Sequence, residues 1–167
     1  MYDDERKIKS FTPAQAKLKA ESYCAYQERS QQEVRDKLYE WGLHSVDVER
    51  IIGELITDNF LNEERFALAY ASGKFRMKAW GRNKIKQGLI FKKVSLPLIK
   101  IALAHLDDAE YLQKVDDILF KKANTLKDKN PYLRTNKLVQ YAISRGFESA
   151  IVYDQIQQHK KALGIEG

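Results

Sequence analysis

The feature that most constrains the fold is a set of apolar positions that recurs about every fifty residues. Five such positions in the first part of the chain have apolar counterparts 51 residues later, and again a further 53 residues on. The three sets are Val34, Leu38, Leu43, Val48 and Ile52; Ile85, Leu89, Val94, Ile99 and Leu103; and Leu138, Ala142, Phe147, Val152 and Ile156. Within each set the spacing is helical, and such repeats stack so that each buries an open face on its neighbour. The pattern predicts an all-α fold of three tandem three-helix repeats in an elongated, curved array.

Capping residues recur with the apolar positions, which argues against chance similarity between amphipathic helices of similar length. The predicted signals are Thr12 and Ser30 as N-caps, Gln15 and Glu33 as their capping-box partners, Ser45 as the cap of a third helix, and Gly42 and Gly146 as left-handed helix stops. In the middle repeat, Lys93 stands where the other two have glycine. We expect a flexible N-terminal tail at residues 1–11, followed by repeats at 12–59, 60–106 and 107–167.

The charges are distributed unevenly along the chain. The net charge of +6 is made up of −5 over residues 1–64, +10 over residues 65–106 and +1 over residues 107–167. The middle segment contains ten Lys or Arg and no Asp or Glu. Since like charges without counter-ions repel one another, a basic centre of this kind indicates a localised anionic partner.

The basic segment begins in a predicted amphipathic helix that starts at Asn62. Its expected apolar stripe is Phe66, Ala69, Tyr70, Gly73 and Met77. The pair Trp80-Gly81 is expected to end this helix before a second one carries Ile85 and Leu89 inward. Seven basic residues of this region are candidates for binding a partner through solvent-facing side chains: Arg65, Lys74, Arg76, Lys78, Arg82, Lys84 and Lys86.

The same region resembles the motif of the RecX family, bacterial regulators of the RecA recombinase. The matching positions are Asn59-Phe60-Leu61-Asn62-Glu63, Arg65-Phe66-Ala67, Tyr70, Lys74, Lys78, Trp80-Gly81, Ile85 and Leu89, with Arg29-Ser30, Glu33-Val34, Lys37-Leu38 and Trp41-Gly42 upstream. The family more often has Gly-aromatic-Gly-Pro where this chain has Ala79-Trp80-Gly81-Arg82, and Gly where it has Lys93.

The resemblance implies a tandem three-helix architecture and a regulatory function. It implies a protein that binds RecA filaments on DNA and inhibits RecA ATPase, strand exchange and co-protease activity. The basic middle repeat would then meet acidic recombinase surface, DNA phosphate or both, which leaves room for a non-specific DNA contact. We expect a monomer that lodges along the filament.

Residues suited to catalysis are few. His44, His105 and His159 are scattered without carboxylates or cysteines at ligand spacing, and no glycine-rich phosphate loop is present. The pairs Asp107-Asp108 and Asp116-Asp117 are better explained by favourable charge at a helix start. We therefore expect no enzyme activity, no metal and no cofactor.

Composition also bears on location. No run of about 18 apolar residues and no charged-then-apolar leader occurs, so neither a membrane partner nor export is expected. The single Cys24 lies in an apolar helical stripe, which indicates a core residue. One cysteine cannot form an intrachain disulfide, which fits a reducing cytoplasm.

A helix-turn-helix protein that acts on DNA directly is the alternative from another class. Each repeat could present its third helix to a DNA groove. However, the expected third helices at 46–58 and 96–105 are largely apolar or acidic.

Overall fold

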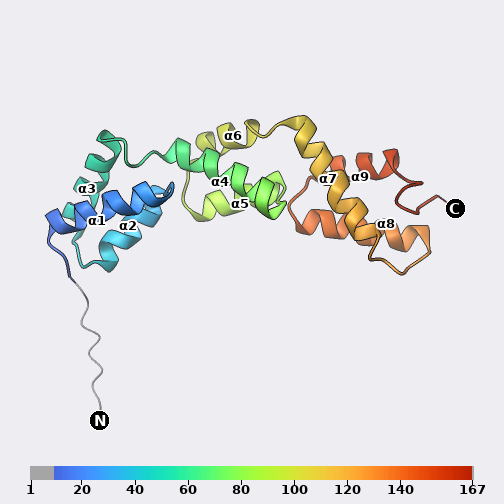
Figure 1. The fold of residues 1–167 in the computed structure, drawn as a ribbon, viewed down its shortest axis with the longest axis horizontal. Coiled ribbons are helices and arrows are strands. Elements are labelled where there is room, and N and C mark those ends of the chain that lie inside the picture. The colour runs from blue at the N-terminus through green and yellow to red at the C-terminus, as the bar shows by residue number, and fades with distance from the viewer. Residues whose placement is uncertain (1–9, 167) are drawn as a thin grey trace, which may run out of the picture. The chain divides into compact units, whose positions relative to one another are not determined.

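The computed structural model describes residues 10–166 of the chain and contains nine α-helices and no strand in that range (Figure 1). The helices are α1 (Pro13–Tyr26), α2 (Gln31–Glu40), α3 (Ser45–Thr57), α4 (Glu63–Lys78), α5 (Arg82–Phe91), α6 (Leu96–Ala104), α7 (Asp108–Ala123), α8 (Pro131–Ser144) and α9 (Ser149–Gln158). The predicted all-α fold built from three-helix groups is confirmed, while the elongated, curved array stays a prediction.

The chain forms two compact units. Among the described residues, the first contains 10–67 together with 92–94, and the second contains 68–91 and 95–166. The predicted tail at 1–11 lies outside the described residues except for Ser10 and Phe11. Phe11 packs edge-on against Trp41, with ring centroids 6.2 Å apart. The division into repeats at 12–59, 60–106 and 107–167 stays a prediction.

Two of the helix starts follow directly from capping boxes in the sequence. Thr12 and Ser30 each cap a helix in a complete capping box, α1 with Gln15 and α2 with Glu33. The prediction for Ser45 is wrong by one position. Ser45 is the first residue of α3, and the N-cap is His44, which makes no capping hydrogen bond through its side chain.

Each second helix is followed by a left-handed residue two positions after its end. Gly42 and Gly146 adopt φ angles of +87° and +94° after α2 and α8. After α5, Lys93 takes the same region with φ +59°, and Ala79 after α4 has φ +53°. At both positions the motif that this chain resembles more often has glycine, so the backbone keeps the turn although the side chain disfavours it.

We expect Lys93→Gly to stabilise the protein by about 1 kcal/mol, because it removes the clash of Cβ in the left-handed region. Thermal melting followed by circular dichroism measures the effect. Lys93→Ala is the matched control: it also removes the charge but keeps Cβ, so it should leave the melting temperature nearly unchanged. A lower melting temperature for Lys93→Gly would contradict this account of the turn.

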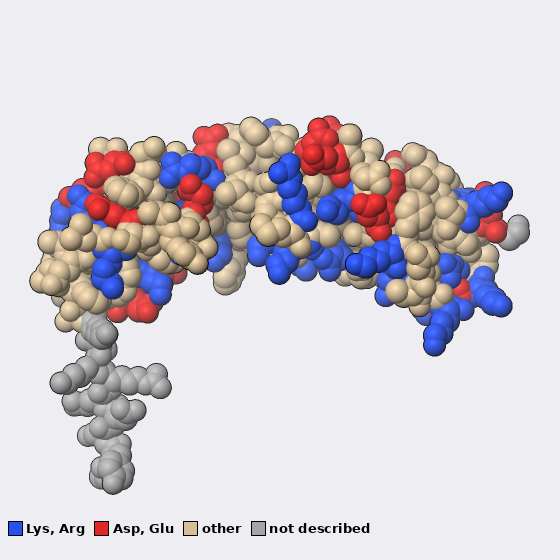
Figure 2. Space-filling view, in the orientation of Figure 1, with Lys and Arg blue, Asp and Glu red and all other residues tan. Residues whose placement is uncertain are grey.

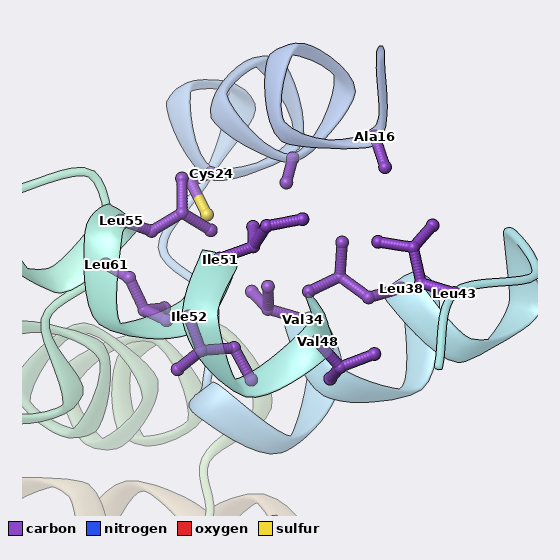
Figure 3. Close-up of a cluster of buried hydrophobic side chains, with 11 residues drawn as sticks. Ala16, Cys24, Val34, Leu38, Leu43, Val48, Ile51, Ile52, Leu55 and Leu61 are labelled. Atoms are coloured by element: carbon purple, nitrogen blue, oxygen red, sulfur yellow. The ribbon is translucent and has the colours of Figure 1, made fainter. Parts of the chain in front are cut away.

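The repeating apolar positions form the interior. Fourteen of the fifteen are buried, and Leu103 is half-buried. In the first unit they join residues of α1 and Leu61 in one cluster (Figure 3). Cys24 belongs to this cluster, and burial raises the pKa of its thiol to about 11, so it stays protonated and inert at neutral pH.

The predicted apolar stripe of α4 is largely wrong. Ala69 is exposed and Met77 is 82% exposed, whereas Phe66, Ala67, Ala71 and Phe75 are the buried side chains. Phe75 turns inward because it stacks on Tyr111 of α7, with ring centroids 5.7 Å apart. The buried side of α4 is therefore set by a partner more than thirty residues away.

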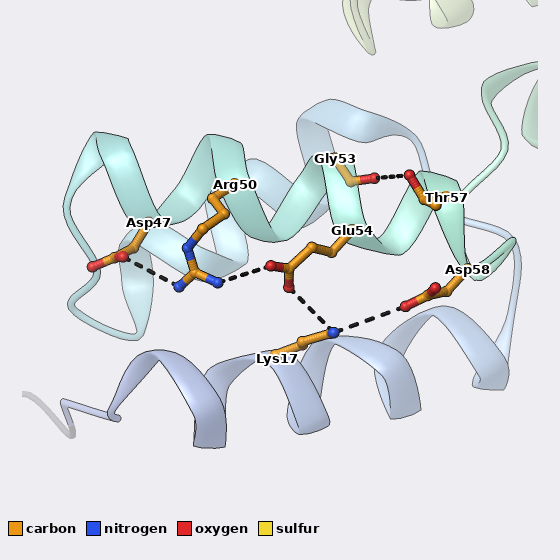
Figure 4. Close-up of polar contacts among 7 residues, drawn as sticks. All are labelled: Lys17, Asp47, Arg50, Gly53, Glu54, Thr57 and Asp58. Carbon is orange, nitrogen blue, oxygen red and sulfur yellow. Dashed lines mark hydrogen bonds and ion pairs between the residues drawn. The ribbon is translucent and has the colours of Figure 1, made fainter.

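Two basic residues of the first unit each bridge two acidic groups (Figure 4). Lys17 of α1 pairs with Glu54 at 3.2 Å and with Asp58 at 3.8 Å, and Arg50 links Glu54 to Asp47 along α3. Hydrogen bonds from Lys17 and Arg50 lower the pKa of Glu54. These exposed pairs contribute little to stability, but they leave few free charges on α3.

Candidate partner-binding surface

Four of the predicted site residues, all of them lysines, have no acidic partner in the part of the chain that the structure describes. This lysine set comprises Lys74 and Lys78 of α4 and Lys84 and Lys86 of α5. None of the four makes an ion pair within residues 10–166. Figure 2 shows Lys and Arg side chains gathered over the middle of the chain, where α4 and α5 lie in Figure 1.

Two members of the lysine set lie against one aromatic ring. The Nζ atoms of Lys74 and Lys84 are each 4.8 Å from the centroid of Trp80, and that of Lys74 is also 5.4 Å from the centroid of Tyr70. A lysine over an aromatic face gains about 0.5–1 kcal/mol at an exposed site. Trp80 thus holds two positive charges close together between α4 and α5. Lys78 and Lys86 are exposed.

The three arginines of the predicted site are paired. Arg65 contacts Glu28 at 2.5 Å and also donates to the backbone carbonyls of Asn59 and Phe60. Arg76 approaches Glu110 at 3.6 Å, with both side chains exposed. The idea that no acid compensates the basic run is therefore wrong for the arginines, because their partners come from distant parts of the sequence.

Arg82 is the most enclosed of the three. Its side chain is 23% exposed and contacts Asp108 and Glu148, each at 3.0 Å, while its guanidinium lies 3.8 Å from the centroid of Tyr111. The Tyr111 hydroxyl accepts from the Arg82 backbone N–H at 2.9 Å and donates to Glu148. Burial, and then the bond to Glu148, raise the pKa of Tyr111. Arg82 is thus held in place and does not face solvent as predicted.

A close backbone contact completes this arrangement. Gly81 donates its N–H to the Arg145 carbonyl at 2.8 Å, and Asn83 donates to the Gly146 carbonyl at 3.0 Å. The Arg145 side chain donates to the carbonyls of Lys78 and Ala79 at the end of α4. We call the set Gly81, Arg82, Tyr111, Arg145 and Glu148 the α5–α8 joint. It fixes α5, which carries Lys84 and Lys86, on α7 and the turn after α8, and Arg145 also connects the end of α4 to that turn.

Sequence reasoning missed Tyr111, Arg145 and Glu148. In the sequence pattern Tyr111 is only a core residue, and the other two flank the Gly146 stop. The corresponding residues of the first repeat are Trp41 and His44, which do not share this charge pattern. Because Arg145 and Glu148 place two opposite charges at only one of the three equivalent turns, this difference between the repeats is the sequence signal that could have identified them.

A groove borders the joint. It has a volume of about 480 Å³ and lies between α5 and the C-terminal end of α8. Its lining consists of Asn83, Lys84, Lys86, Gln87, Ile90, Ile143, Ser144 and Gly146. We call it the α5–α8 groove. It places two members of the lysine set beside two isoleucines.

Other charged residues of the described chain also have structural contacts. Asp107 caps α7 by accepting from the Glu110 backbone N–H, and Asp116 accepts from Gln155 and lies 3.2 Å from His159. Lys92 pairs with Glu33 at 2.7 Å. No helix within residues 10–166 combines the length and apolar character that crossing a membrane requires.

Two family models match the chain. One is described as the first three-helix domain of RecX and matches residues 16–55, and the other as its second three-helix domain and matches residues 62–103. Both matched ranges lie within the first two predicted repeats.

Individual relatives agree with the family models. The regulatory protein RecX of Clostridium perfringens (strain 13 / Type A) is 34% identical over 122 residues, which cover 72% of this chain and 57% of the relative. That of Lactococcus lactis subsp. lactis is 30% identical over 152 residues, 89% of this chain and 56% of the relative. The chain spans a little more than half the length of these curated relatives.

A solved structure extends the similarity to the fold. The crystal structure of RecX from Lactobacillus salivarius superposes with a TM-score of 0.82 at 26% identity, covering 89% of this chain and 97% of that chain.

Proposed function

Because the chain belongs to the RecX family of regulatory proteins, we propose that it binds the filament that RecA forms on DNA and inhibits its ATPase, strand exchange and co-protease activity. Membership of this family also means that the chain is not an enzyme. It acts on the activity of another protein, as a monomer in the cytoplasm, where that filament forms.

The observation that supports this proposal is the lysine set. Four ammonium groups that have no acidic partner within residues 10–166 lie on two consecutive helices, α4 and α5. A filament of protein on DNA offers anionic surface, both phosphate and carboxylate, and complementary charge speeds association and fixes orientation. Arg76 and Arg82 belong to the same two helices, but acidic partners offset their charges, so the proposal rests on the four lysines.

The α5–α8 joint supports the proposal in a second way. A rigid frame lets several weak contacts act together, because fixing one contact raises the effective concentration of the next. The joint holds α5, with Lys84 and Lys86, on α7 and the turn after α8, and its Arg145 also contacts the end of α4, which carries Lys74 and Lys78.

The test is the ATPase of RecA on single-stranded DNA with this chain added below the recombinase concentration. We expect hydrolysis to slow at substoichiometric amounts, and the inhibition to weaken as salt rises, since screening shortens the range of the charges. Strand exchange and co-protease cleavage should fall in parallel. Undiminished hydrolysis with the chain in excess over RecA would overturn the proposal.

A further inference from the structure

The α5–α8 groove has an apolar part that charge attraction alone does not explain. Ile90 of α5 is 49% exposed and Ile143 of α8 is 45% exposed, and both line the groove. Single exposed aliphatic residues are common on protein surfaces. Here two of them line one groove beside two lysines that have no acidic partner among the described residues, and together they form a surface that a partner side chain can cover.

The polar part of the groove favours anions. Lys84 and Lys86 line it with the amides of Asn83 and Gln87, and no carboxylate of the described residues is among its lining. The carbonyls at the end of α8 would repel an anion if they were free. Those of Arg145 and Gly146 accept instead from the backbone N–H groups of Gly81 and Asn83.

We propose that the α5–α8 groove binds an extended acidic peptide segment that carries one aliphatic or aromatic side chain. The carboxylates of the segment meet Lys84 and Lys86, its backbone meets the amides of Asn83 and Gln87, and its apolar side chain covers Ile90 and Ile143. The inference rests on the proposed function in one respect: the segment belongs to the protein part of the filament.

The lining favours a peptide over nucleic acid. Phosphate requires cations and backbone donors but gains nothing from isoleucine, and single-stranded DNA is recognised by bases that stack on aromatic rings. The aromatic ring that Lys84 contacts is Trp80, which already holds a second ammonium group. An apolar peptide side chain that is buried against Ile90 and Ile143 contributes favourable binding free energy through the hydrophobic effect.

Peptide binding can be measured without any recombinase. The probe is a short fluorescein-labelled peptide of Glu and Gly with one central Leu, and its anisotropy is followed as the full chain is added. A second peptide has Ser in place of Leu. We expect the Leu peptide to bind about tenfold more tightly than the Ser peptide, and both to weaken as salt increases.

Variants locate the binding. Ile90→Ser with Ile143→Ser should remove the preference for Leu, and Lys84→Gln with Lys86→Gln should weaken both peptides about tenfold. Leu112→Ser, on an exposed position of α7, and Lys121→Gln with Lys127→Gln are the matched controls and should change neither. If the double isoleucine variant melts below the assay temperature, the single Ile143→Ser variant should still halve the preference.

Three results would overturn the inference. The two peptides could bind equally, the control variants could act like the groove variants, or the isoleucine variants could weaken single-stranded oligo(dT) while leaving the Leu peptide unchanged. The last result would make the groove a nucleic-acid contact. Inhibition of RecA measured on the same proteins keeps the two proposals separate. Inhibition without a preference for the Leu peptide would reject only the groove proposal. A preference for the Leu peptide without inhibition would reject only the proposed function.

Discussion

Replacing Gly81 by alanine is expected to lower the free energy of unfolding by about 3 kcal/mol or more, because the added Cβ overpacks a backbone contact. That Cβ would lie 2.4 Å from the carbonyl carbon and oxygen of Gly146 and 2.4 Å from the backbone nitrogen of Phe147. Backbone atoms cannot move aside as the end of a side chain can. The turn after α8 must therefore shift, and the hydrogen bonds that Gly81 and Asn83 donate to it weaken.

Urea unfolding followed by circular dichroism measures this loss. Gly53→Ala is the matched control, because Gly53 lies inside α3 and an added Cβ there meets no atom within 4 Å. That variant should gain about 0.5–1 kcal/mol from helix propensity. A Gly81→Ala protein as stable as the wild type would mean that α5 does not approach the turn after α8 this closely.

Replacing the lysine set with glutamine is expected to reduce inhibition of the RecA ATPase by an order of magnitude or more, since four charges of a salt-sensitive interface are removed together. The quadruple variant is Lys74→Gln, Lys78→Gln, Lys84→Gln and Lys86→Gln. Its stability should change little, because the substitutions remove only surface interactions, chiefly those of the ammonium groups with the rings of Tyr70 and Trp80. Arg82 stays in place, since removing it would break the α5–α8 joint.

A charge-matched control separates site from net charge. Lys121, Lys127, Lys129 and Lys161 are exposed and make no ion pair within the described residues, so their replacement by glutamine removes the same charge elsewhere. This control should inhibit nearly as well as the wild type.

Binding of bare single-stranded DNA by both variants shows which anion the lysine set contacts. Loss of DNA binding with inhibition intact would assign it to phosphate.

The repeat can be predicted from the sequence because its causes are local. Helical spacing decides which of Val34, Leu38 and their counterparts point inward, and capping residues such as Thr12 and Ser30 decide where helices begin. The left-handed turn at Lys93 is predictable even though the residue is unfavourable there. Equivalent turns at Gly42 and Gly146 indicate the backbone that the repeat requires.

The electrostatics of the site cannot be predicted in the same way. Arg82 and its partner Glu148 are 66 residues apart, and Arg65 and Glu28 are 37 apart. Whether the basic residues of a segment have acidic partners depends on which helices the fold brings together. The sequence of the segment alone does not contain that information. The buried side of α4 escapes prediction for the same reason, because Tyr111 decides that Phe75 faces inward.

The central claim is that this chain binds the RecA filament through the lysine set. Co-sedimentation with RecA filaments preassembled on single-stranded DNA tests it most directly, with wild type, the quadruple lysine variant and the charge-matched control compared over a series of salt concentrations. We expect wild type and the control to sediment with the filament at low salt, and the lysine variant to remain in the supernatant at every salt concentration. Equal sedimentation of the lysine variant and the wild type would contradict the claim.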